Sequence, residues 1–308
     1  MAEQKTENQN DLRKLQLVEL DILKEFLRIC KKHHLRYYAL GGTLLGAVRH
    51  EGFIPWDDDI DVGMPRPDFR RFEKIVEKEL PEYLHYCSFK KTEGYNHYVP
   101  RITDSRVKVI DESAAVDAEK EAWIDIFPLD GMPGNKYLRK IHCFRLLIAR
   151  ARVNYSLFST NVDLKRKRPL HEQILINAGK ILPVEKIFRT ERELKRLDRM
   201  MQKYSYDSSP YLVNFMGIHK LKEMFHRKHY GKGADYPFED ISLRGPKDYD
   251  FVLRQMYGEY WNPPSAQEMN HHNTRIKEGS YGNRFRNDVF CSDGCVRKRK
   301  SGIIPTEY

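Results

Sequence analysis

The chain has 308 residues, of which 40% are hydrophobic and 12% aromatic, enough for one sizeable core or a core with a helical annex. Its charged residues, 32% of the total, are interspersed with apolar ones, which excludes wholesale disorder. The formal net charge of +10 indicates an anionic partner: a nucleotide, a phosphorylated acceptor, an anionic membrane surface or a nucleic acid.

The amino terminus lacks the apolar region of a secretory signal. The most apolar basic segment, 141–158, is interrupted by Arg145, Arg150 and Arg152 and falls short of the ~20 apolar residues of a membrane span. We expect a cytoplasmic protein, with peripheral association with the inner face of the membrane as a further option. The five cysteines favour reduced thiols, and the close pair Cys291 and Cys295 is weak evidence for zinc.

The first half of the chain predicts alternating helices and strands. Residues 1–10 are polar and expected to be disordered, and 11–34 form an amphipathic helix through Leu15, Val18, Ile22, Phe26 and Ile29. A short buried strand is predicted at 36–40, a helical turn at 43–48, a loop at 49–57 and a strand at 58–64. A helix follows, with Asp68 as its predicted N-cap and Pro81 as its end.

Two or three short strands are predicted within 84–110, and another at 122–127, ended by Pro128. Residues 136–204 are helical and basic, with 161–169 an exposed connection, and 236–272 are mixed, with a helix at 248–256. These segments predict a catalytic core over 11–135, a basic helical region over 136–235, a C-terminal part of the catalytic domain over 236–272 and a basic tail over 273–308.

The acidic segment 57–61 is the clearest candidate site. In a strand, Asp59 and Asp61 share one face, roughly 6–7 Å apart, while Ile60 and Val62 share the other. Two bare carboxylates there repel each other, and a divalent cation with a preference for oxygen ligands, Mg²⁺ or Mn²⁺, would relieve the repulsion. The alternative is a solvent-facing edge strand with acidic residues, but four acids in five positions of a basic protein favour function.

Other residues extend this candidate site. Gly41 and Gly42 would let the backbone approach a phosphate, and Arg49 and His50 would add positive charge. Asp125 is the one acid in an apolar strand, so we expect it to complete the metal site or to act as a general base. Its alternative is a salt bridge to Arg101 or Arg106.

The segments 41–50 and 52–64 together closely resemble the signature of the LicD family, which includes bacterial phosphocholine transferases and is similar to the fukutin-type proteins of animals. The resemblance continues at 123–130 and, more patchily, between Phe238 and His272. It implies an α/β nucleotidyltransferase-like fold, a mixed sheet flanked by helices, here with a basic helical insertion.

The resemblance also implies Mg²⁺ or Mn²⁺, a CDP-linked donor such as CDP-choline, and a hydroxyl acceptor on teichoic acid, lipopolysaccharide or another cell-surface glycan. It assigns metal binding and catalysis to Asp59, Asp61 and Asp125. It extends substrate contacts to eight further residues: Gly41, Gly42, Thr43, Arg49, His50, Trp56, Arg101 and Lys108. Glu239 and His271 match the family pattern without an assigned role.

A choline group would need an aromatic face, for which Trp56, Tyr37, Tyr38 and Trp123 are candidates, although aromatic residues at such positions are more often core. The basic segment 136–168 has two interpretations: a surface for anionic lipid, or a solvated helical face with Leu146, Leu147 and Ile148 packed inward.

Two other functions stay open. One is nucleotidyl transfer from a nucleoside triphosphate with release of pyrophosphate, and the other is non-catalytic binding of an anionic polymer. A nucleic-acid partner is the less favoured interpretation, because an idle protein would tend to lose Asp59, Asp61 and Asp125.

Overall fold

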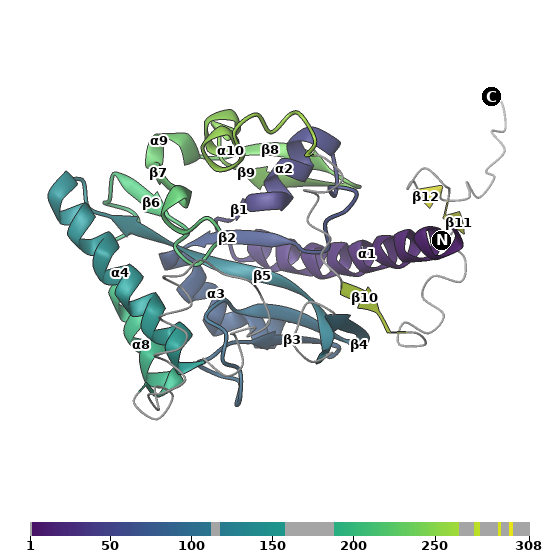
Figure 1. The fold of residues 1–308 in the computed structure, drawn as a ribbon, viewed down its shortest axis with the longest axis horizontal. Helices are drawn as coiled ribbons and strands as arrows, with labels where there is room; N and C mark the ends of the chain where they lie inside the picture. Colours follow the sequence, from purple (N-terminus) through teal and green to yellow (C-terminus); the bar gives the residue numbers. More distant parts are fainter. Residues whose placement is uncertain are drawn as a thin grey trace, which may run out of the picture.

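The computed structural model describes residues 2–111, 118–157, 188–264, 274–277, 289–290 and 296–297. Its centre is a curled mixed sheet in the order β1 (Tyr38–Ala39), β2 (Asp61–Pro65), β5 (Ala118–Met132), β4 (Arg101–Asp111) and β10 (Thr274–Ile276) (Figure 1). β3 (Leu84–Cys87) pairs with β4, and β6 (Tyr211–Val213) joins the end of β5 to β7 (Met224–His226). β2 and β5 are parallel, whereas the other paired strands are antiparallel. The sheet and its flanking helices confirm the expected α/β nucleotidyltransferase-like fold.

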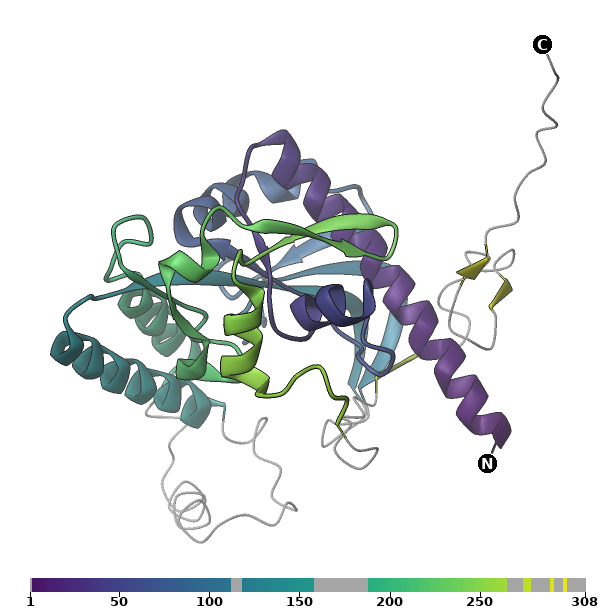
Figure 2. The ribbon, with the colours of Figure 1, turned by 90° about the horizontal axis from the view of Figure 1, so that it is seen from above.

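Helix α1 (Ala2–Lys32) crosses the sheet and packs against β4, β5 and β10 (Figure 2). The five apolar residues that predicted this helix are all buried: Leu15, Val18, Ile22, Phe26 and Ile29. The helix begins at Ala2, so helical structure extends into the segment that we expected to be disordered.

Helix α3 (Arg66–Glu79) packs against β2, β3 and β5. It begins two residues before the predicted cap, because Pro67 is suited to the first turn of a helix. The prediction for Asp68 is therefore wrong: it lies inside the first turn, buried, and its Oδ2 accepts a hydrogen bond from Arg36 Nε at 2.6 Å.

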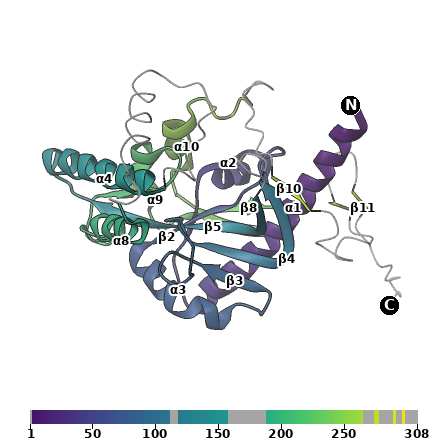
Figure 3. The same cartoon turned by 60° about the horizontal axis from the view of Figure 1, so that its bottom comes forward.

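Helices α2 (Gly41–His50) and α10 (Tyr249–Tyr257) lie on the other side of β2 from α3 (Figure 3). The hairpin of β8 (Ala234–Phe238) and β9 (Ile241–Gly245) packs against α2 and β1. The short element η1 (Lys220–Glu223) lies between β6 and β7, and α9 (Arg227–Tyr230) connects β7 to this hairpin. β11 (Val289–Phe290) pairs with β12 (Val296–Arg297).

Strand β5 does not end at Pro128, contrary to the sequence prediction. It continues to Met132, with Pro128 opposite Met64 of β2 and Gly131 opposite Leu212 of β6. A proline removes one backbone donor, and pairing on both sides of it keeps the strand extended. The longer strand carries the sheet from the catalytic core into the annex.

The annex consists of α4 (Lys136–Ser156) and α8 (Thr190–Met201), which pack on each other around a second apolar cluster. Leu146 is buried there as expected, whereas Leu147 and Ile148 are 38% and 46% exposed, so their predicted inward packing is wrong. The predicted connection 161–169 lies outside the described residues. Within the described ranges, no helix combines the length and the apolarity needed to cross a membrane.

A buried ion-pair network joins the annex to the core. Arg66 of α3 donates to Asp130 of β5 through Nε at 2.7 Å and to Asp198 of α8 through Nη1 at 3.0 Å. Tyr98 closes the network by donating to Asp198 at 2.8 Å. Asp130 is 1% exposed and depends on Arg66 for charge compensation, whereas Asp198 also pairs with Lys90 at 3.1 Å.

We predict that Arg66→Met lowers the free energy of unfolding by about 3–5 kcal/mol, since it leaves Asp130 buried without its cation. Urea unfolding followed by circular dichroism measures the loss. Arg71→Met, on the exposed side of the same helix, is the matched control and should change stability by no more than about 0.5 kcal/mol. Equal stabilities for the two variants would contradict the assigned network.

Candidate active site

The parallel pairing of β2 and β5 places two predicted acids side by side. Asp61 and Asp125 are register partners, and the Asp125 amide donates to Ile60 O at 2.9 Å. Register partners in a sheet point to the same face. The opposite face carries Ile60, Val62 and the equivalent apolar residues of β5, which are fully buried. Asp61 and Asp125 therefore share the face that is not taken up by the core.

Asp59 reaches this place from a loop, because β2 begins only at Asp61. The charge of Asp59 is the leading neighbouring charge acting on Asp61, and that of Asp125 follows. The three predicted acids thus lie within electrostatic reach of one another, two on neighbouring strands and one on the loop that enters β2.

The N-terminus of α2 faces the same carboxylates. Gly41 has φ +49°, and a Cβ on it would lie 3.4 Å from Asp61 Oδ2 and 3.7 Å from Tyr257 Oη. A Cβ on Gly42 would collide with the carboxylate of Asp57. Thr43 Oγ1 accepts a hydrogen bond from the Asp61 amide at 2.8 Å. The two glycines therefore leave room for carboxylates at a helix end whose dipole favours negative charge.

Burial makes this concentration of charge costly. It raises the pKa of Asp61 well above its usual value, and the charges of Asp59 and Asp125 raise it further. Burial and the charge of Asp58 raise the pKa of Asp57 to about 7. A bound cation would lower this cost by compensating the carboxylates directly.

Helix α1 contributes an acid that the sequence interpretation missed. Glu19 is 2% exposed, and its Oε2 has no hydrogen-bond partner among the described residues. Burial and then the charges of Asp59, Asp58, Asp57 and Asp125 raise its pKa well above the usual value. One turn earlier, Gln16 Nε2 donates to Asp57 O at 2.9 Å. Both polar residues lie on the buried side of the helix, which is the signal that could have revealed them.

Asp125 is also engaged by neighbours on its own sheet. Arg101 Nε donates to Asp125 Oδ1 at 2.8 Å, and Trp123 Nε1 donates to Asp125 Oδ2 at 3.0 Å. The guanidinium of Arg101 lies 4.3 Å from the centre of the Trp123 ring. Arg106 instead binds Asp104. The salt bridge considered as an alternative role for Asp125 therefore exists, with Arg101, on the same face as Asp61.

Four of the predicted substrate contacts do not lie at Asp61. Arg49 and His50 are at the far end of α2, about 12 Å along the helix from Gly41. The centre of the Trp56 ring lies 5.9 Å from the Arg49 guanidinium carbon, and the ring contacts His50 edge-on. Lys108 pairs with Glu121 at 3.0 Å, roughly 13 Å along β5 from Asp125.

Tyr257 and Glu223 are neighbours of the site that sequence reasoning did not select. Burial and then the charge of Asp61 raise the pKa of Tyr257. Burial raises the pKa of Glu223 to about 7, while the His219 amide and Asn214 Nδ2 donate to its carboxylate. Tyr257 lies in the C-terminal stretch that resembles the family, which was the available signal.

Glu239 has a structural role. It accepts two hydrogen bonds from Arg13, at 2.9 and 2.6 Å, and one from the Phe53 amide at 3.2 Å. These contacts hold α1 against the loop that leads to the acids. His271 lies outside the described residues, as do Cys291 and Cys295, whereas Cys30, Cys87 and Cys143 are free thiols.

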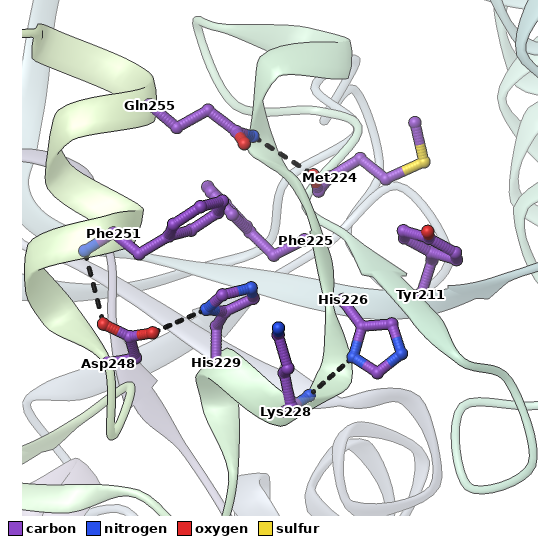
Figure 4. A pocket seen from close by; sticks show the side chains of 9 residues that line it. All are labelled: Tyr211, Met224, Phe225, His226, Lys228, His229, Asp248, Phe251 and Gln255. Carbon is purple, nitrogen blue, oxygen red and sulfur yellow. Dashed lines mark hydrogen bonds and ion pairs between the residues drawn. The ribbon is translucent and has the colours of Figure 1, made fainter.

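A cavity of about 560 Å³ lies along one face of α10, where Asp248, Phe251 and Gln255 line it (Figure 4). It is lined by aromatic and basic side chains, among them Tyr211, His226, Lys228 and Phe251. His229 stacks on Phe251, and its Nδ1 donates a hydrogen bond to Asp248 Oδ2 at 2.7 Å. The cavity contains none of the predicted site residues.

The family model for the LicD/FKTN/FKRP nucleotidyltransferase domain matches residues 34–140, the segment with all three predicted acids. Lipopolysaccharide cholinephosphotransferase LicD of Haemophilus influenzae is 30% identical over 270 residues, which cover 85% of this chain and 96% of that protein. The chain belongs to the LicD family. It is accordingly a phosphotransferase that acts on substituted phosphate groups.

Matches to other LicD relatives are shorter. An uncharacterized protein of Rickettsia typhi is 33% identical over 110 residues, 34% of this chain and 30% of that protein. Ribitol 5-phosphate transferase FKRP of Homo sapiens is 46% identical over 41 residues, 13% of this chain and 8% of that protein.

The donor chemistry of this LicD site suits a divalent cation, because such ions prefer oxygen ligands and would compensate the repulsion that helps to raise the pKa values of Asp57 and Asp61. In the part of the chain that the structure describes, however, no group of three or more His, Cys, Asp or Glu side chains is already gathered as metal ligands. Asp125 is held by Arg101 instead. Metal binding by Asp59, Asp61 and Asp125 therefore stays a prediction.

We predict that Glu19→Gln stabilises the protein at pH 8 and leaves its stability nearly unchanged at pH 4. The raised pKa means that folded Glu19 keeps its proton while the unfolded residue loses it, so wild-type stability falls as pH rises above the unfolded value. The expected gain at pH 8 is on the order of 1–3 kcal/mol, measured by urea unfolding.

Glu25→Gln is the control on the same helix, where Glu25 pairs with Arg28 near the surface. The difference between Glu19→Gln and wild type should grow with pH, and that for Glu25→Gln should not. A Glu19→Gln variant that is less stable than wild type at pH 8 would contradict the assigned environment.

Proposed function

We propose that this protein transfers phosphocholine, or a similar substituted phosphate, from a CDP-linked donor to a hydroxyl group of a cell-surface glycan such as lipopolysaccharide or teichoic acid. The main observation behind this proposal is that Asp59, Asp61 and Asp125 cluster beside the N-terminus of α2, which begins with two glycines. The extended similarity to a lipopolysaccharide cholinephosphotransferase supports this choice of transferred group and acceptor class.

The proposed reaction is an in-line displacement. The acceptor oxygen forms a bond to the phosphorus that bears the choline ester, and the bond from that phosphorus to the CMP oxygen breaks. The proton of the acceptor hydroxyl passes to a carboxylate, for which Asp125 is the candidate, and CMP leaves as an anion. Arg101, whose Nε lies 2.8 Å from Asp125 Oδ1, would bind the negative charge of a donor phosphate on the same face.

A divalent cation, Mg²⁺ or Mn²⁺, would be held by Asp59 and Asp61. When bound, such an ion neutralises charge on the phosphates and compensates the buried carboxylates. The chain itself supplies the placement: Thr43 fixes the Asp61 backbone, and Gln16 fixes the loop at Asp57.

Each of the four aromatic residues considered for choline is already engaged by the protein. Tyr38 is 4% exposed and Tyr37 packs against the main core, so neither presents a free ring face. Trp123 already stacks with Arg101. Trp56, half-buried on the loop next to Asp57, likewise has the Arg49 guanidinium over its ring, 5.9 Å from the ring centre. Choline binding by any of these rings therefore stays a prediction.

We predict that purified wild-type protein with Mg²⁺, CDP-choline and a glycan acceptor releases CMP, and that Asp61→Asn lowers the rate at least about a hundredfold. The variant should remain folded, because removing one charge relieves repulsion in the site. Thermal unfolding checks the fold, and Glu25→Gln is the control for activity. Near-wild-type turnover by Asp61→Asn would overturn the site assignment.

The same assay with a panel of other donor nucleotides separates the proposed reaction from its alternatives. CDP-ribitol tests the transferred group named for FKRP, and CTP or ATP tests nucleotidyl transfer, which would release pyrophosphate instead of CMP. Release of neither product with any donor, combined with salt-sensitive binding of nucleic acid or another polyanion, would favour the non-catalytic interpretation.

We predict that Asp125→Asn lowers the turnover number by about 10²–10⁴-fold, the usual contribution of a positioned general base. Glu121→Gln is the matched control on the same strand, since Glu121 binds Lys108 and Thr103 away from the acids. Steady-state kinetics across pH measure the effect. If Asp125→Asn keeps the wild-type turnover number and pH profile, Asp125 is not the base.

A further inference from the structure

Helix α4 has two apolar faces. One packs on α8 through Leu146, Ala149 and Val153. Tyr137, Ile141, Phe144 and Ile148 recur at intervals of four, three and four residues, which places them in one line on the opposite side. Their exposed fractions are 76%, 57%, 65% and 46%. We call these four residues the outer stripe.

The charges on α4 have a single sign. Its sequence from Lys136 to Ser156 contains no Asp or Glu. Three of its basic side chains are engaged by the protein: Arg139 with Pro133 O, Arg150 with Phe215 O and Arg152 with Glu193. Lys136, Lys140 and Arg145 are exposed and flank the outer stripe. A long apolar line bordered by cations is typical of a helix that lies in the interface of an anionic membrane.

The helix is connected to the active site. Arg150 Nη1 donates to Phe215 O at 2.7 Å and to Gly217 O at 3.4 Å, which fixes the loop that carries Ile218, 79% exposed, and His219. The His219 ring meets Tyr257 edge-on at 5.1 Å, and Tyr257 lies beside Gly41 and Asp61. These contacts connect the C-terminal half of α4 to the residues around the acidic site.

We propose that the outer stripe docks this protein on an anionic lipid bilayer, with Lys136, Lys140 and Arg145 contacting lipid phosphates. The apolar line would enter the boundary between headgroups and acyl chains, and the basic side chains would set the preference for anionic lipid. This inference does not depend on which group the enzyme transfers. It selects one of the two interpretations of the basic segment.

The test is co-sedimentation of the full chain with vesicles of phosphatidylglycerol and phosphatidylcholine in equal parts. We expect wild type to bind, with at least about tenfold weaker binding to pure phosphatidylcholine vesicles. The double variant I141D/F144D should bind the anionic vesicles at least about tenfold more weakly than wild type, and K136Q/K140Q/R145Q should do the same. All variants should retain the thermal unfolding midpoint of wild type, because the changed side chains are exposed.

Lys74→Glu on α3 is the matched control, since it changes the net charge by the same two units at an exposed position away from α4. It should bind vesicles nearly as well as wild type. The proposal is overturned if wild type does not bind anionic vesicles, or if Lys74→Glu loses as much binding as I141D/F144D. It is overturned as well if wild type binds no vesicles and instead forms a dimer, seen by light scattering, that the I141D/F144D substitutions dissociate. It is also overturned if I141D/F144D unfolds at a lower temperature and wild type does not bind, which would indicate that the chain itself covers the stripe.

Discussion

The parallel pairing of β2 with β5 is the constraint on which the rest of the structure depends. It puts Asp61 in register with Asp125 on one sheet face and leaves the apolar residues of both strands on the other. A pairing shifted by one residue would turn one carboxylate into the core, because adjacent strand residues alternate between faces. The long β5 then extends past Pro128 and joins the annex, so one strand positions both the site and helix α4.

The site concentrates negative charge at the cost of stability. Raised pKa values for Asp57, Asp61 and Glu19 show that burial and mutual repulsion disfavour their ionised forms. Such an arrangement is retained where function requires it, as in other active sites whose residues are not optimal for folding. Helices α1 and α2 reach the acids from two sides, and Gln16 of α1 holds the loop at Asp57 in place.

Local patterns were sufficient to predict much of the fold. The alternation around Asp61 and the single acid in the strand at Asp125 led us to expect these two acids to lie together, which the register of β2 and β5 confirms, since the side-chain period of a strand can be read from the sequence. Glu19 and Tyr257 were missed because they reach the acids only through packing between segments far apart in the chain. Three other predictions were wrong for the same reason. Strand partners on both sides keep Pro128 inside β5, Arg36 binds Asp68 within the first turn of α3, and Leu147 lies on a side of α4 that the protein leaves exposed.

The central claim is that Asp59 and Asp61 bind a divalent ion on the face they share with Asp125. Crystals grown with Mn²⁺ and a CDP-linked donor, measured near the manganese absorption edge, test it most directly. The account predicts an anomalous peak within about 2.0–2.6 Å of carboxylate oxygens of both Asp59 and Asp61, next to the donor phosphates. A bound donor with no anomalous peak between those two residues, or with its phosphates held elsewhere, would contradict it.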